Sequence, residues 1–420
     1  MKKLIACLLL VCVLLPLLAA CGEEKGEVVT LYVYNWGEYI SDGSEGSLDV
    51  NAAFEEWYAQ NHEGKRVEIN YSTFSSNEDM YTKISSGATK YDVIVPSDYM
   101  LARMINEGML RPLNFENIPN AQYIDNEILF RGEAPYYDPT AEYSVPYTYG
   151  TIGIIYNEMM LKDEDLAAIE AGLGSWGIMW NEEYEGNILQ FNNSRDALAT
   201  AQYYLGYSVN TDNEAEWREA LDLLMQQKPL VQGYVMDEIY NKMENGSAAI
   251  APYYAGDFFT MFADNEDLAF FYPREGTNIF VDAMCVPVGS QHPEIAEEYI
   301  NFMLSEEAAV ANAEYICYAS PNKLVTQNED YIATMQELHP DAMEILYGTD
   351  RIPTEAYENL PEERLTLLNE LWEDLKIEST IGGTIIGLAS AIVVGLAGAG
   401  IFFYIRRRKR RRIVANLWND

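Results

Sequence analysis

The sequence contains few of the residues that build metal sites and disulfide frameworks. Its three histidines, His62, His292 and His339, are too scattered to form a recognisable metal-ligand motif. Of its five cysteines, only Cys285 and Cys317 lie outside the first 21 residues; whether they pair stays open, but a disulfide-stapled fold is excluded. The sequence also lacks Gly-x-Ser-x-Gly, His-Glu-x-x-His and phosphate-loop motifs. We therefore expect neither an enzyme nor a bound metal or cofactor.

Basic residues are also scarce, with 27 Lys and Arg against 66 Asp and Glu, a formal net charge of −39. Nine of the basic residues lie near the ends, at Lys2, Lys3 and 406–412. Without these nine and Asp420, 18 basic residues remain against 65 acidic ones, a net charge of −47. Such a surface repels nucleic acid and attracts cations, although salt screens its field over about 8 Å. No nucleic-acid partner is expected.

Long apolar runs occur only at the two ends of the chain. Lys2 and Lys3 precede an apolar stretch that ends in Leu-Ala-Ala-Cys at residues 18–21, which resembles the lipobox of bacterial lipoproteins. We predict a signal peptide over residues 1–20 and lipid attachment at Cys21. An ordinary secretory signal is the alternative, and in both cases the mature protein is exported.

The second apolar run covers 25 charge-free residues, 381–405. As a helix it would be about 38 Å long, which is enough to span a bilayer. The uninterrupted basic residues 406–412 follow, so the positive-inside rule predicts a cytoplasmic tail at 406–420 and an extracytoplasmic main domain. The Leu-Pro-x-Thr-Gly motif of a cell-wall sorting signal is missing. We therefore predict a transmembrane helix retained in the cell membrane.

Between these ends lie about 355 residues, which are too many for one hydrophobic core and indicate two α/β lobes. Segments near 143–147 and 280–284 are expected to cross between the lobes, which gives a hinge with a cleft beside it. We assign 27–146 and 282–322 to lobe 1, and 147–281 and 323–376 to lobe 2. Predicted strands cover 28–34, 67–71, 92–95, 152–156, 187–191 and 248–251. Predicted helices cover 50–60, 161–171, 194–205, 213–226, 293–304 and 361–375, and another begins at Ser76.

Acidic and aromatic residues recur where these strands end or cross. The first strand runs into Asn-Trp-Gly-Glu-Tyr at residues 35–39, and the strand near 92–95 runs into Pro-Ser-Asp-Tyr at 96–99. Similar groups occur at 254–257 and 280–282. Because open α/β sheets bind ligands at strand ends, these segments predict a binding site. Glu38 is expected to have a structural role in hydrogen bonding.

Several of these segments resemble the spermidine/putrescine-binding proteins that feed bacterial ABC importers. The resemblance rests on residues 34–39, 91–97, 145–147, 280–282 and 319–322. It implies a two-lobed periplasmic-binding fold that closes on a polyamine and delivers it to ABC permease subunits, and we expect a monomer. It also implies a ligand site formed by Trp36, Tyr39, Ser97, Tyr99, Asp196, Tyr254, Asp257, Phe280, Asp282 and Tyr318.

The chain departs from this family at several site positions. Asp196 stands where members often have Glu, Tyr254 where they have Trp, and Asn193 where some have a further acid. Residues 351–359 cannot be aligned. Asp257 three residues after Tyr254, together with Phe280, is similar to putrescine-binding members. The ligand is therefore predicted to be putrescine or spermidine, with a slight preference for putrescine.

The chemistry of a polyamine agrees with these residue types. Its ammonium groups have pKa values near 10.4 and must be paired with carboxylates when they are desolvated. Its methylene groups pack on aromatic faces, which also attract the ammonium charge. Asp196, Asp257 and Asp282 would provide the carboxylates. The aromatic walls would come from Trp36, Tyr39, Tyr99, Tyr254 and Phe280.

Three other functions stay open. The Tyr253–Tyr254 pair resembles that of ferric-ion-binding proteins of the same fold. Cys285 or Cys317 could be the nucleophile of a hydrolase, although no histidine has a matching spacing. The predicted membrane helix is also compatible with a membrane-anchored polyamine receptor that has no importer.

Overall fold

A computed structural model describes residues 27–130, 132–348 and 351–377. The predicted signal peptide (1–20), Cys21, the predicted membrane helix (381–405) and the basic tail (406–420) lie outside these ranges. Among the described residues, no helix is both long and apolar enough to cross a membrane. The description below concerns residues 27–377 within these ranges.

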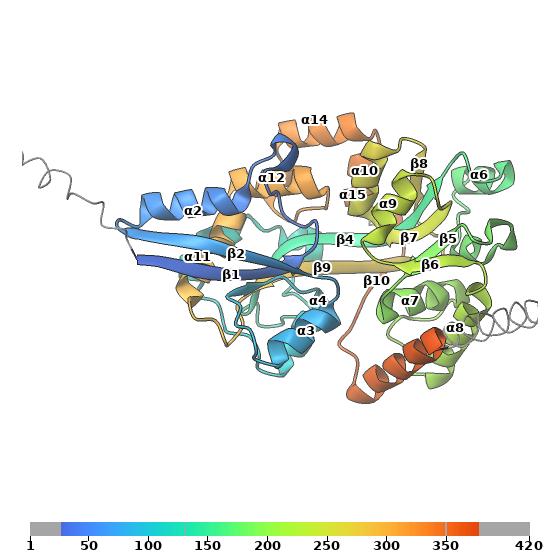
Figure 1. Cartoon of the computed structure of the whole chain (residues 1–420), viewed down its shortest axis with the longest axis horizontal. Coiled ribbons are helices and arrows are strands. Elements are labelled where there is room, and N and C mark those ends of the chain that lie inside the picture. The colour runs from blue at the N-terminus through green and yellow to red at the C-terminus, as the bar shows by residue number, and fades with distance from the viewer. Residues whose placement is uncertain (1–26, 131, 349–350, 378–420) are drawn as a thin grey trace, which may run out of the picture.

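The domain is built on one mixed sheet that continues through two lobes (Figure 1). The strand order is β2-β1-β3-β9-β4-β7-β5-β6, with β8 beside β4 and β10 beside β9. β1 pairs in parallel with β2 and β3 in one lobe, and β5 pairs in parallel with β6 and β7 in the other. The predicted two-lobed α/β fold is confirmed. The strands are β1 Glu27–Trp36, β2 Lys65–Phe74, β3 Val93–Ile94, β4 Ser144–Asn157, β5 Ile188–Phe191, β6 Val231–Val235, β7 Ile250–Tyr254, β8 Leu268–Phe271, β9 Thr277–Cys285 and β10 Thr354–Ala356.

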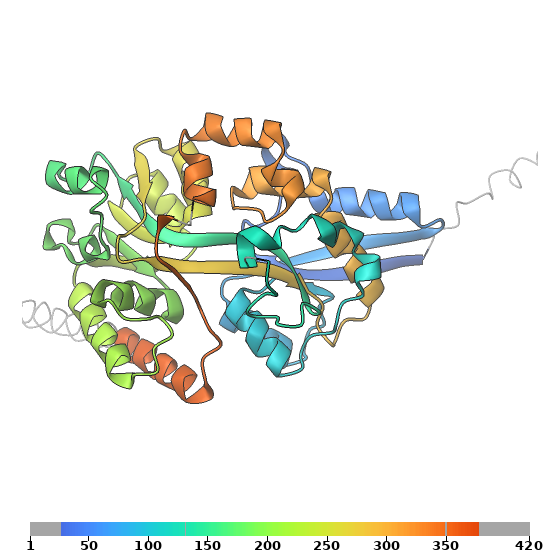
Figure 2. The same ribbon diagram turned by 180° about the vertical axis from the view of Figure 1, so that it is seen from behind.

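Two long strands, β4 and β9, connect the lobes. They pair antiparallel from Ser144 opposite Cys285 to Thr151 opposite Ile279, with an irregularity between Pro146 and Thr148. Figures 1 and 2 both show them running through the centre of the molecule. The segments predicted to cross between lobes are thus parts of two hydrogen-bonded strands. The exact division of the chain at 146/147, 281/282 and 322/323 stays a prediction.

Helices cover both faces of the sheet in each lobe (Figure 1). Beside β1 and β2, α2 lies on one face and α3 and α4 on the other; beside β5–β7, α9 and α10 lie on one face and α7 and α8 on the other. The main helices are α2 Val50–Asn61, α3 Asn77–Ser85, α4 Asp98–Asn106, α5 Asn126–Phe130, α6 Asp163–Glu170, α7 Ser194–Leu205, α8 Glu214–Gln227, α9 Glu238–Glu244, α10 Ala255–Asp264, α11 Pro293–Met303, α12 Glu306–Ile316, α13 Lys323–Thr326, α14 Glu329–Leu338 and α15 Ala342–Tyr347. A last helix covers 362–377.

The helix starts follow local capping rules. Ser76 accepts a hydrogen bond from the Asp79 amide (3.1 Å) and begins α3 as predicted. Asn193 accepts from the Asp196 amide (2.8 Å) and begins α7. Both caps lie beside the cleft described below, so they fix the first turn of a helix that carries site residues.

The prediction that a strand would end before Pro252 was wrong. β7 continues through Pro252 to Tyr254 and pairs with β4 along this stretch. Its other neighbour, β5, pairs with β7 only at Ile250. From residue 251 onward β7 therefore has a ladder partner on one side only, and a proline is tolerated at such an edge. Tyr254 is thus the last residue of a strand, directly before α10.

Leu371 in the C-terminal helix is a direct test of how lobe 2 is held together. It is 1% exposed and packs with Leu198, Trp217 and Leu375 in one apolar cluster. Leu371→Ala should lower the free energy of unfolding by about 2–5 kcal/mol because it leaves a cavity. Leu173→Ala, at a position 55% exposed, is the matched control and should change it by less than about 0.5 kcal/mol. Equal effects in urea denaturation would contradict this packing.

Candidate functional site

A cavity of about 880 Å³, counting the open space at its mouth, lies where the two lobes face each other. Its walls come from the ends of β1 and β7, from β9, and from the first turns of α3, α4, α7 and α10. The structure therefore brings together segments separated by more than 200 residues. All ten predicted site residues line it: Trp36, Tyr39, Ser97, Tyr99, Asp196, Tyr254, Asp257, Phe280, Asp282 and Tyr318. That they bind ligand stays a prediction.

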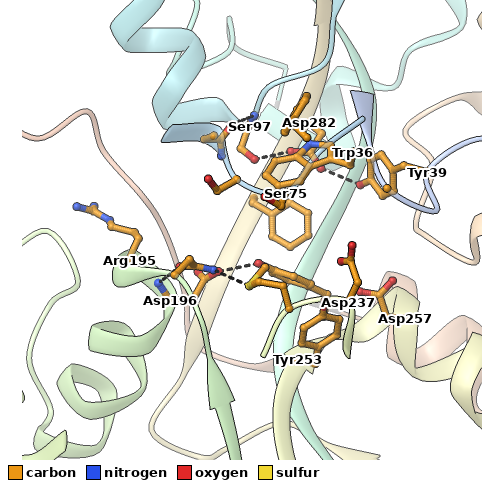
Figure 3. A pocket seen from close by; sticks show the side chains of 18 of the residues that line it. Trp36, Tyr39, Ser75, Ser97, Arg195, Asp196, Asp237, Tyr253, Asp257 and Asp282 are labelled. Carbon is orange, nitrogen blue, oxygen red and sulfur yellow. Dashed lines mark hydrogen bonds between the residues drawn. The ribbon is translucent and has the colours of Figure 1, made fainter. Parts of the chain in front are cut away.

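Asp282 is the carboxylate that lies on one of the two strands connecting the lobes. It lies on β9 and is 3% exposed. The Ser97 hydroxyl donates to its Oδ1 (2.6 Å) and the Tyr39 hydroxyl donates to its Oδ2 (2.7 Å). Both donors come from the loops that follow β1 and β3, so Asp282 holds these strand ends together (Figure 3).

Asp257 is held in the same way in the first turn of α10. The Tyr240 hydroxyl donates to Oδ1 (2.7 Å) and the Tyr318 hydroxyl donates to Oδ2 (2.9 Å). Close packing fixes the ring of Tyr318, because a Cβ at Gly256 would lie 2.2 Å from it. A glycine is therefore required beside this ring.

Asp196 completes the set of three, in the first turn of α7. Its Oδ1 accepts from the Tyr357 hydroxyl (2.9 Å) and its Oδ2 from the Tyr254 hydroxyl (2.6 Å). The side-chain amide of Asn193 also donates to Oδ2 (2.7 Å). In each of the three carboxylates, both oxygens thus accept a hydrogen bond from a hydroxyl group. Since a carboxylate oxygen has two lone pairs, each of these oxygens can still accept a further hydrogen bond, except Asp196 Oδ2, which already accepts from both Tyr254 and Asn193.

Comparisons with known proteins agree with this geometry. The model of the bacterial extracellular solute-binding protein family matches residues 52–337. The spermidine/putrescine-binding periplasmic protein of Salmonella typhimurium is 30% identical over 326 residues, which cover 76% of this chain and 85% of that protein. The chain belongs to the bacterial extracellular solute-binding proteins.

Other members of this family are similar in sequence or in structure. The putrescine-binding periplasmic protein of Escherichia coli is 26% identical over 73% of this chain and 81% of its own length. A solved structure of a putative spermidine/putrescine ABC transporter from Listeria monocytogenes is 33% identical, covers 83% of this chain and 99% of its own, and superposes with a TM-score of 0.70.

Burial strongly affects the ionisation of two of these three carboxylates in this solute-binding protein. Desolvation raises the pKa of Asp257 to about 7, although hydrogen bonds from Tyr240 and Tyr318 lower it. Desolvation likewise raises the pKa of Asp282 to about 6 against hydrogen bonds from Ser97 and Tyr39. Charged carboxylates are therefore costly here unless a cation enters the cavity. The site favours a positively charged ligand.

Aromatic rings separate the three acids. Tyr254 and Phe280 meet edge to face with ring centroids 5.5 Å apart, and Phe280 is 6.3 Å from Tyr318. Trp36 packs against Phe74 at 4.5 Å. The indole N–H of Trp36 is buried and has no hydrogen-bond partner among the described residues. These rings form apolar walls between charged positions.

Several cavity residues were missed by the sequence prediction. Tyr357 lies in the segment 351–359, and β10 places it in the site by pairing with β9. Tyr240 and Asp237 follow β6, a strand that was not predicted. Arg195 and Glu78 are direct neighbours of predicted or capping residues, but no pattern marked them as site residues. Glu38, expected to be structural, also lines the cavity.

The cysteines and the tyrosine pair do not have the geometry of the alternative functions. Cys285 and Cys317 are free and buried, and burial raises the pKa of Cys285 well above its usual range and that of Cys317 to about 12. Neither thiol is activated as a nucleophile. The Tyr254 hydroxyl donates its proton to Asp196, and burial raises the pKa of both Tyr253 and Tyr254. Tyrosinate ligation of iron is disfavoured.

The raised pKa of Asp257 predicts a pH dependence of stability. The folded protein binds this proton more tightly than the unfolded chain, so its stability should fall as pH rises from about 4 to about 7. Compared with Asp257→Asn, the ligand-free protein should lose about 3 kcal/mol between pH 4.5 and 7.5. Urea denaturation of both proteins at the two pH values measures this difference. Parallel pH profiles would contradict the assignment.

Proposed function

We infer that this solute-binding protein captures a polyamine, putrescine or spermidine, in the cleft and delivers it to an ABC permease. The observation that carries this proposal is the set of three cavity carboxylates, each already oriented by two hydroxyl groups and separated by aromatic rings. Relatives described as spermidine/putrescine-binding and putrescine-binding proteins support it.

The site matches a polyamine chemically. Each ammonium group has three N–H donors and carries one positive charge at neutral pH. Asp196 and Asp257 lie on opposite sides of the cavity, with Trp36 and Asp282 between and above them (Figure 3). A flexible diamine can place one ammonium at each side and its methylene groups against the rings. The hydroxyls of Tyr39, Tyr240, Tyr254, Tyr318 and Tyr357 then keep the carboxylates aimed at the ligand.

The same features support a binding role without catalysis. The described residues that line the cavity provide aromatic rings and carboxylates that accept hydrogen bonds from hydroxyl groups, and none of them is a cysteine or a histidine. A ferric-ion carrier is a weaker candidate, because Tyr254 is committed as a donor to Asp196. A membrane-anchored polyamine receptor without an importer shares this site and differs only in its partners.

The proposal includes the location of the protein. Cys21 as a lipid anchor, residues 381–405 as a membrane helix and 406–420 as a cytoplasmic tail would hold the domain at the outer face of the cell membrane. The short connection after residue 377 would keep a monomer close to its permease, which raises its effective concentration there. In this arrangement lobe 1 comprises 27–146 and 282–322, and lobe 2 comprises 147–281 and 323–376.

Calorimetry on the full-length protein in detergent tests the proposal directly. Putrescine or spermidine should bind, and Asp282→Asn should weaken binding about 30-fold or more because a desolvated ammonium loses its charged partner. Asp222→Asn removes an exposed acid from α8 and serves as the matched control, with less than a threefold effect. The proposal fails if neither polyamine binds, or if both substitutions have the same effect.

A further inference from the structure

Arg195 is a buried cation in a cleft that otherwise suits cationic ligands. It is 5% exposed and is the only Lys or Arg among the described residues that line the cavity. It occupies the first turn of α7, where the helix dipole disfavours positive charge. Burial lowers its pKa from the usual arginine value. A neutral side chain would avoid all of these costs, so the presence of a buried positive charge at this position needs an explanation.

The contacts of Arg195 do not neutralise it. Its Nη2 donates to Asn210 Oδ1 (2.7 Å) and to the Glu358 carbonyl (3.4 Å), which are uncharged acceptors. Among the described residues, its buried Nε has no hydrogen-bond partner and no carboxylate forms an ion pair with its guanidinium. The guanidinium lies over the ring of Tyr357, 4.5 Å from its centroid. It therefore keeps its positive charge at this end of the cavity.

Two acids lie close enough to feel this charge. Asp196 accepts the hydroxyl of Tyr357, the same ring that the guanidinium covers. Glu78, on the facing lobe, accepts the Tyr99 hydroxyl (3.0 Å), and the field of Arg195 acts on both carboxylates. Figure 3 shows the guanidinium directed away from Asp196. Two negative charges and one positive charge give this end a net charge of −1.

At the opposite end of the cavity, none of the described lining residues is a lysine or an arginine. Asp257 lies there, and the charges of Asp237 and Glu38 act on it. No hydrogen bond or ion pair of the Asp237 carboxylate occurs within the described residues, and this carboxylate lies 3.4 Å from where a Cβ on Gly37 would stand. This end therefore carries up to three negative charges. The two ends of the cleft differ in how many ammonium groups they can balance.

We propose that Arg195 is a specificity-determining residue that limits the Asp196 end of the cleft to one ammonium group, so that a longer polyamine extends only toward Asp257. This proposal rests on the proposed polyamine-binding function. A diamine places one ammonium at each end. A triamine must place its extra ammonium near Asp257 and Asp237, because a second cation at the Asp196 end would be repelled by the guanidinium of Arg195.

Arg195→Met tests the charge while retaining an apolar stem over Tyr357. The Asp196 end of the cleft then carries a net charge of −2. The affinity for spermidine relative to putrescine should therefore rise about tenfold in calorimetry on the full-length protein. Adding Glu78→Gln returns this end to −1 and should abolish the gain. If Arg195 had a purely structural role, the effect of Arg195→Met would not be reversed by Glu78→Gln on the facing lobe. Arg218→Met, at an exposed arginine paired with Glu214, is the matched control and should leave the ratio unchanged.

Glu78→Gln alone tests the same claim with Arg195 in place and with little risk to folding, since Glu78 is exposed. It should weaken the binding of putrescine and of spermidine by the same factor. Asp237→Asn should instead weaken the binding of spermidine more than that of putrescine. A larger loss for spermidine in Glu78→Gln would place its extra ammonium beside Asp196 and overturn the proposal. If Arg195→Met still binds polyamines but its affinity for spermidine relative to putrescine is unchanged, the proposal is also overturned. If the unaltered protein binds neither polyamine, the proposed function itself fails.

Discussion

The cost of burying negative charge between the lobes is the constraint on which the site depends. Asp257 and Asp282 are desolvated enough that their pKa values rise to about 7 and about 6. Tyrosine and serine hydroxyls offset part of this cost and fix the direction of each carboxylate. The hydroxyls come from segments far apart in the chain. The same hydrogen bonds therefore tie β9 to the loops after β1 and β3, and tie α10 to the segment after α12 that contains Tyr318. Ligand recognition and local architecture thus share one set of interactions.

The fold places these groups where two lobes can close around a ligand. β4 and β9 run through both lobes as a hydrogen-bonded pair, and Asp282 lies on β9 opposite Thr148, which itself contacts the Tyr39 hydroxyl (2.6 Å). The carboxylate of Asp282 is therefore part of the two strands that connect the lobes. Asp196 and Asp257 follow at helix N-termini, where the helix dipole favours a carboxylate. A cation bound between these groups would reduce the electrostatic cost at all three positions.

Much of this arrangement was predictable from sequence, because its signals are local. Strand ends that carry aromatic and acidic residues located the loop at 35–39 and Ser97, a predicted crossing between the lobes located Asp282, and Ser76 marked a helix start. Tyr357 could not be found in this way: it reaches Asp196 only because the three-residue strand β10 pairs with β9. Arg195 was missed for a different reason, since a lone arginine in a helix gives no sign of whether its charge is buried. Long-range pairing and burial are properties of the folded chain.

Proton release on ligand binding tests the central claim most directly. If a bound polyamine pairs with carboxylates that are partly protonated in the free protein, binding at pH 6.5 should release more than about half a proton, mainly from Asp257. Calorimetry of putrescine or spermidine binding in buffers with different ionisation enthalpies measures this number. The release should disappear at pH 8.5, where these carboxylates are already charged. Binding heats independent of the buffer at pH 6.5 would contradict the account.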